Sequence, residues 1–72
     1  MTKELDDMLE RVRRALARTT GRKLSGDLAA MADQARTFAE QAEQTRSRDL
    51  STAVNLAKRA DLFAIDLLAR LP

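Results

Sequence analysis

The sequence predicts an all-α fold, a small bundle of three helices that run up, down and up. The chain is 44% hydrophobic, its single Pro is the last residue, and its two Gly fall between helix candidates. This composition favours helix, because Ala, Leu, Arg and Glu have high helix propensity. Apolar residues recur at helical spacing near residues 3–19, 26–45 and 50–71. With 72 residues, the chain is expected to form one domain, 1–72, with a small core.

Composition also bears on function. The chain contains no Cys and no His, which excludes disulfides, zinc sites built from thiolate or imidazole, and histidine acid–base catalysis. We expect no enzyme activity, no cofactor and no metal. No run of 18 apolar residues could span a membrane, and no signal peptide is present, so the chain as written is expected to be cytoplasmic. If it is a fragment of a longer exported protein, its location is open.

The first predicted helix, 3–19, is amphipathic, with acidic residues in its first turns and Arg in its last, each sign matched to the helix dipole. Gly21 follows it and is expected to adopt the left-handed conformation that ends a helix. The apolar stripe consists of Leu5, Met8, Leu9, Val12, Ala15 and Leu16.

The second predicted helix begins near residue 26, with Ser25 as the N-cap and Leu24 packing back onto the first turn. Many of its apolar residues are Ala, so another helix can approach closely, and Phe38 and Met31 are expected in the core. The stripe follows a strict spacing of three and four, at Leu28, Met31, Ala35, Phe38 and Ala42, and is widened by Ala32 and Ala39.

A turn is predicted at residues 45–49, with Asp49 as the N-cap of the third helix. This segment has neither Gly nor Pro. Without the turn, the second and third helices would form one long rod that could bury its stripe only against another chain.

The third predicted helix has an apolar surface that covers about half of its circumference, more than the roughly 100° needed for one neighbour. We therefore expect it to pack against both other helices. One side carries Leu50, Ala53, Val54, Ala57, Ala64, Ile65 and Leu68, and the adjoining side carries Leu56, Ala60, Phe63, Leu67 and Leu71.

The pair formed by the second and third helices is similar to a known hairpin. Asp49-Leu50, Ala53 and Arg59-Ala60 resemble the second helix of tetratricopeptide-like units, and residues 23–69 resemble a hairpin near the C-terminus of many uncharacterised, often exported, bacterial proteins. The resemblance implies a packing unit with no activity attached. A peptide-binding groove is not implied, because the first-helix signature is missing and only one copy is present where about three form a stable array.

Asp61 interrupts the apolar surface of the third helix. A buried carboxylate needs a partner, which would be an Arg of the first helix or Lys58. Alternatively, Asp61 is a polar specificity residue that sets register or oligomeric state. Catalysis would require a second carboxylate beside it, such as Asp66 or Asp33, and a bundle this small has little room for such a cavity.

The best candidates for an exposed apolar patch are Leu62, Ala69 and the line of Phe63, Leu67 and Leu71, of which this line is the candidate partner-binding site. For Phe63 and Leu67 the alternative is a core contact with the first helix. Leu62 is expected to point away from both apolar sides of the helix. The expected function is a non-catalytic interaction or structural module that binds a protein partner or forms a homodimer.

A basic run near the first turn supports a second function, a small nucleic-acid-associated protein that neutralises phosphates. The sequence contains no Tyr or Trp to stack on bases, and a net charge of +2 is weak support for a polyanion partner. The run consists of Arg11, Arg13, Arg14, Arg18, Arg22 and Lys23, with no acidic residue between them.

Overall fold

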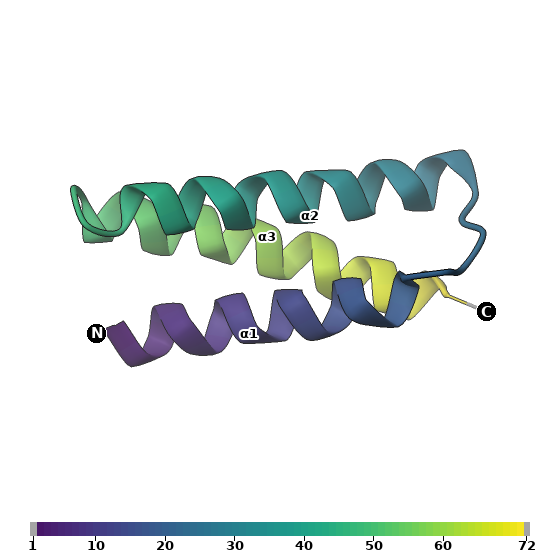
Figure 1. The fold of residues 1–72 in the computed structure, drawn as a ribbon, viewed down its shortest axis with the longest axis horizontal. Coiled ribbons are helices and arrows are strands. Elements are labelled where there is room, and N and C mark those ends of the chain that lie inside the picture. The colour runs from purple at the N-terminus through teal and green to yellow at the C-terminus, as the bar shows by residue number, and fades with distance from the viewer. Residues whose placement is uncertain (1, 72) are drawn as a thin grey trace.

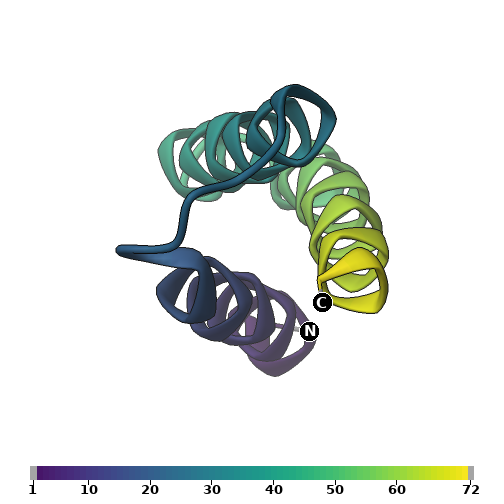
Figure 2. The same ribbon diagram turned by 90° about the vertical axis from the view of Figure 1, so that its right-hand side faces the viewer.

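The chain folds into three α-helices in the computed structural model, which describes the backbone of residues 2–71 and the side chains of residues 3–71. The helices are α1 (Thr2–Thr19), α2 (Gly26–Thr45) and α3 (Leu50–Arg70). They lie side by side in a bundle of 36 × 18 × 17 Å, with α1 and α3 parallel and α2 antiparallel to both (Figures 1 and 2). The predicted all-α, up-down-up bundle is therefore confirmed.

The first turn has the predicted glycine conformation. Gly21 has a φ of 80°, in the left-handed region that favours Gly. The hydroxyl groups of Thr19 and Thr20 donate to the carbonyl oxygen of Leu16 at 2.7 and 3.3 Å, and thus satisfy one of the carbonyl groups left free at the helix end.

Ser25 occupies the N-cap position of α2, as predicted, but it acts through its backbone alone. Its φ and ψ of −64° and 164° are extended, and its carbonyl oxygen accepts a hydrogen bond from the N–H of Ala29 at 2.8 Å. The Ser25 side chain makes no capping hydrogen bond.

The second turn is present, and α2 and α3 are separate helices, so the alternative of one long rod is wrong. The N–H groups of Arg48 and Asp49 both donate to the carbonyl oxygen of Thr45, at 2.9 and 2.8 Å. The Asp49 carboxylate caps α3, because it accepts from the Thr52 N–H at 3.1 Å and from the Thr52 hydroxyl at 2.7 Å. Asp49 is thus the N-cap that was predicted.

Alanine forms the centre of the core. Four Ala of α3 point between the other two helices and are at most 2% exposed, and their small side chains allow close approach on both sides. The expectation that α3 packs against two partners is confirmed by two buried clusters that each draw on all three helices. The first cluster contains Leu5, Met8, Leu9, Ala42, Ala53 and Ala57, and the second contains Val12, Ala15, Ala35, Ala60 and Ala64.

Several of the larger apolar side chains of α2 and α3 lie at the margin of this core, although Leu67 of α3 has no exposed surface. Phe38 and Met31, which were expected inside it, are only half-buried. The ring of Phe38 stacks on that of Phe63 with centroids 5.8 Å apart, and the Arg59 guanidinium lies 5.9 Å from the centre of the Phe38 ring. Phe63 therefore packs on Phe38 of α2, beside the buried cluster to which Val12 and Ala15 of α1 belong.

Enlarging the alanine seam should destabilise the bundle. Ala57 has no exposed surface, so Ala57→Leu forces α3 away from its neighbours, and we expect the free energy of unfolding to fall by about 1–3 kcal/mol. Ala69 is an exposed residue of the same helix, and Ala69→Leu should change this energy by less than about 0.5 kcal/mol. Urea unfolding followed by circular dichroism measures both, and equal effects would contradict the role given to the seam.

The Asp49 cap should make stability depend on pH. Hydrogen bonds from Thr52, first from its hydroxyl and then from its N–H, lower the pKa of Asp49 below its ordinary value of 3.8. The charged cap therefore stabilises the fold above this ordinary value, and its contribution is lost as the pH falls through the lower, folded-state pKa. We expect Asp49→Asn to lower the melting temperature by a few degrees at neutral pH. The gap to wild type should close once the pH is below the folded-state pKa of Asp49, and a gap independent of pH would refute this assignment.

Candidate interaction face

One surface of the bundle is formed jointly by α1 and α3, where these two parallel helices lie side by side (Figure 2). On each helix, its residues follow one another at steps of three and four, next to the buried stripe. We call this surface the α1/α3 face. It comprises Glu4, Asp7, Arg11, Arg14 and Arg18 of α1 and Leu50, Val54, Lys58, Asp61, Ile65 and Leu68 of α3.

The α1/α3 face is hollowed near both of its ends. A groove of about 320 Å³ has Ile65 and Leu68 on its α3 side and arginines on its α1 side, among them Arg14 and Arg18. Toward the other end, a groove of about 310 Å³ is bordered by Glu4 of α1 and by α3 residues that include Val54. Each groove thus combines apolar α3 residues with charged α1 residues, basic in the first groove and acidic in the second.

An ion pair joins the two helices at the middle of this face. The Arg11 guanidinium donates to both carboxylate oxygens of Asp61, with Nη2···Oδ2 at 2.9 Å and Nε···Oδ1 at 3.3 Å. The Asp61 side chain is only 13% exposed, and its hydrogen bonds with Arg11 raise the pKa of that guanidinium. The prediction that an Arg of the first helix pairs with Asp61 is confirmed.

Two large hydrophobic side chains of α3 are exposed. Among the described residues, the two large hydrophobic side chains with most exposure are Leu62, at 67%, and Ile65, at 56%. Leu62 was expected to point away from the core, but Ile65 was expected within the apolar side of the helix. The signal that could have identified Ile65 is that Lys58 and Asp61 precede it on the same line of the helix, which marks a boundary with solvent.

The predicted partner-binding residues are used mainly inside the chain. Leu67 has no exposed surface and is a core residue. Phe63 is half-buried against Phe38, and Leu71 is half-buried beyond the last turn of α3. Among the described residues, exposed large apolar side chains remain at Leu62, which lies off the α1/α3 face, and at Ile65, on the flank of α3 that faces α1.

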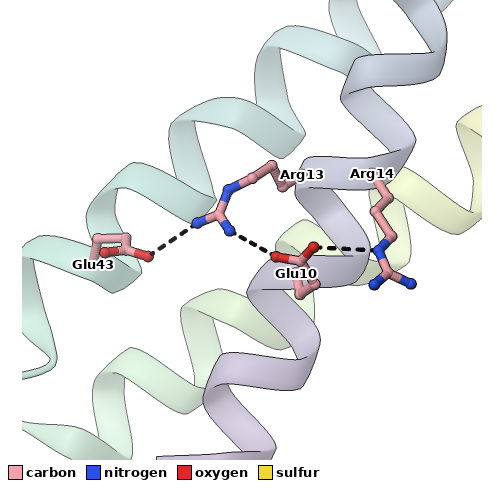
Figure 3. Close-up of polar contacts among 4 residues, drawn as sticks. All are labelled: Glu10, Arg13, Arg14 and Glu43. Carbon is pink, nitrogen blue, oxygen red and sulfur yellow. Dashed lines mark hydrogen bonds and ion pairs between the residues drawn. The ribbon is translucent and has the colours of Figure 1, made fainter.

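The basic run is divided between different surfaces. Arg13 turns toward α2 and lies between Glu10, at 2.7 Å, and Glu43, at 3.9 Å (Figure 3). Arg14 pairs with the same Glu10 at 3.2 Å (Figure 3). Arg11 is held by Asp61. Three of the six cations are thus paired within the chain.

The other three cations lie toward the end of the bundle where α1 ends. Arg18 is in the last turn of α1, and Arg22 and Lys23 are exposed in the loop that follows. Within residues 3–71, no acidic side chain forms an ion pair with any of these three. They are the cations of the run most open to an external anion.

Comparison of the chain with protein-family models, curated protein sequences and solved structures gave no match. Within the described part of the chain, no group of three or more acidic side chains is placed to hold a metal ion. None of the three described helices is long and apolar enough to cross a membrane. Function is therefore inferred from the α1/α3 face itself.

Removing Arg11 should cost more stability than removing a neighbouring arginine. Arg11→Met leaves the nearly buried Asp61 carboxylate without its partner, whereas Arg14→Met leaves Glu10, which is 44% exposed and can be solvated. We expect a clearly lower urea midpoint for Arg11→Met than for Arg14→Met at neutral pH. The double variant Arg11→Met with Asp61→Leu should recover the loss. Equal midpoints for the two single variants would contradict the importance of this pair.

Proposed function

We propose that this chain is a non-catalytic protein-interaction module and that the α1/α3 face is its contact surface. The observation that carries the proposal is the exposure of Ile65, 56%, in a groove of about 320 Å³ whose other side is formed by arginines of α1. Removing the Ile65 side chain from water lowers the free energy, and a bound partner would cover it.

The composition of the face supports this proposal. Protein interfaces combine an apolar centre with a polar rim and are enriched in Arg. On the α1/α3 face, Ile65 and Leu68 lie on α3, and Arg14 and Arg18 lie beside them on α1. Charges of opposite sign toward the two ends of α1 would orient a bound partner, because complementary charges fix the register of an interface.

The pairing of the carboxylates supports a non-catalytic role. Asp61 is held by Arg11. The two acids that could have joined it in acid–base chemistry have partners of their own: Asp66 pairs with Arg70 at 3.3 Å, and Asp33 pairs with a neighbouring arginine of its own helix at 3.0 Å. None of these ion pairs brings two carboxylates together, which general acid–base catalysis by a carboxylate pair would need.

The same packing makes nucleic-acid binding the weaker alternative. Half of the basic run is already paired with acidic side chains of the chain itself. The two aromatic rings, Phe38 and Phe63, stack on each other, so neither is arranged as a free platform for bases. Arg18, Arg22 and Lys23 alone would supply few phosphate contacts.

Site-specific photo-crosslinking tests the proposed contact surface. A benzophenone amino acid is placed at position 65. The matched control carries it at position 34, where α2 has an exposed, uncharged Gln34. The labelled chains are irradiated in the cells of origin and as purified protein. We expect discrete protein adducts from position 65 and none from position 34.

The mass of each adduct identifies what was bound. An adduct of twice the chain mass contains a second copy, and any other protein mass identifies a different partner. Both support an interaction module. Absence of protein adducts at position 65, equal labelling at both positions, or adducts to nucleic acid alone would overturn the proposal.

A further inference from the structure

We propose that the partner of the α1/α3 face is the same face of a second copy of this chain, in an antiparallel homodimer. Each helix of the face lies on its counterpart in the other copy and runs in the opposite direction. The two-fold axis crosses both helices near the Arg11–Asp61 pair. This inference rests on the proposed function and identifies the partner that the face binds.

The charges of α1 are complementary to themselves when one copy is reversed. Glu4 and Asp7 occupy the first part of the stripe, Arg11 the middle, and Arg14 and Arg18 the last part, and all five are exposed. Glu4 and Arg18 are equally far from Arg11, about 10 Å at 1.5 Å per residue. In the antiparallel dimer Glu4 therefore lies opposite Arg18 of the second copy, and Asp7 lies near Arg14 of that copy.

The α3 residues of the face repeat this symmetry independently. Along the helix they read apolar, apolar, charged, charged, apolar, apolar. When one copy is reversed about a point near residues 59 and 60, each apolar residue faces an apolar residue of the other copy. At the two middle positions, opposite charges face each other. The matched pairs are Leu50 with Leu68, Val54 with Ile65, and Lys58 with Asp61.

One axis can serve both helices, because their centres of symmetry lie at nearly the same height in the bundle. The centre of the α1 stripe is Arg11, which pairs with Asp61 of α3 at 2.9 Å. The centre of the α3 stripe lies one and a half to two residues before Asp61, which is about 2–3 Å along the helix. A single two-fold axis, as an isologous dimer requires, therefore satisfies both sets of pairs.

The Arg11–Asp61 pair also reduces the repulsion between the two Arg11 side chains near the two-fold axis. The two Arg11 side chains of the dimer lie close together there, and each is neutralised by its own Asp61. Asp61 in turn faces Lys58 of the second copy. Asp61 then acts as the polar residue that sets the register of the dimer.

The other two-fold arrangement has no such complementarity. An axis parallel to the helices would place α1 of one copy on α3 of the other, with equivalent ends together. Arg14 and Arg18 would then face Ile65 and Leu68, and the acidic residues would face the other apolar end.

The chain has enough surface for such a dimer. A standard interface buries only about 800 Å² per partner, which is a modest part of the 4854 Å² accessible surface of this chain.

Charge reversal across the expected Glu4–Arg18 contact tests the geometry. Glu4→Arg and Arg18→Glu each create two repulsive contacts in a homodimer, and we expect each to weaken dimerisation about tenfold or more. The double variant restores attraction and should dimerise like wild type. A mixture of the two single variants should form a heterodimer with one chain of each. Light scattering and native mass spectrometry, from micromolar to near-millimolar chain, measure these species.

Matched controls separate the interface from effects on the helices. The control for Glu4→Arg is Asp27→Arg, which also replaces an acidic residue in the first turn of a helix. The control for Arg18→Glu is Arg70→Glu, which also replaces a basic residue in the last turn of a helix. Both controls lie off the face and should dimerise like wild type. Circular dichroism of each variant checks folding.

Three results would overturn the inference: a wild-type chain that is monomeric at every concentration, reversals at Glu4 and Arg18 that behave like the controls, or no heterodimer in the mixture. A monomer whose position 65 crosslinks a different protein would reject the second copy and leave the interaction module standing. A chain with no protein adduct at position 65 would reject the proposed function itself.

Discussion

Close approach of three helices along an alanine seam is the constraint on which this structure depends. Four alanines of α3, from Ala53 to Ala64, are at most 2% exposed and contact both neighbouring helices. Alanine costs little conformational entropy when buried, but it also buries little apolar area. The core gains further apolar area from larger side chains with no exposed surface, namely Leu67 of α3 and Leu5 and Val12 of α1.

This constraint explains why large apolar side chains of α2 and α3 appear at the margins. A seam of small residues leaves little room between the helix backbones, so Phe38 and Phe63 stack beside the core. On the opposite flank of α3, Ile65 has no such partner and is 56% exposed. The asymmetry between these two flanks is what distinguishes the α1/α3 face from the rest of the bundle.

Charge divides the same surface into an acidic part, a middle occupied by an ion pair, and a basic part. The Arg11–Asp61 pair joins α1 to α3 at mid-height, where an unpaired carboxylate would be costly. On either side of it the α1 charges change sign, with Glu4 toward one end and Arg18 toward the other. A surface with an apolar component and charges that reverse about its centre is well suited to a self-complementary contact, because one rotation satisfies every pair.

Local sequence signals determined the helices themselves. Gly21 and Asp49 act at the chain turns through their own backbone or side-chain chemistry, and hydrophobic periodicity depends only on nearby residues. The presence of an Arg partner for Asp61 was likewise predictable, since a carboxylate on an apolar side needs a cation. Only the tertiary structure decided that this cation is Arg11 and that Phe63 is covered while Ile65 is not. Both flanks of the third helix carry large apolar residues in the sequence, and how far each is covered depends on where the two other helices fit against its alanines.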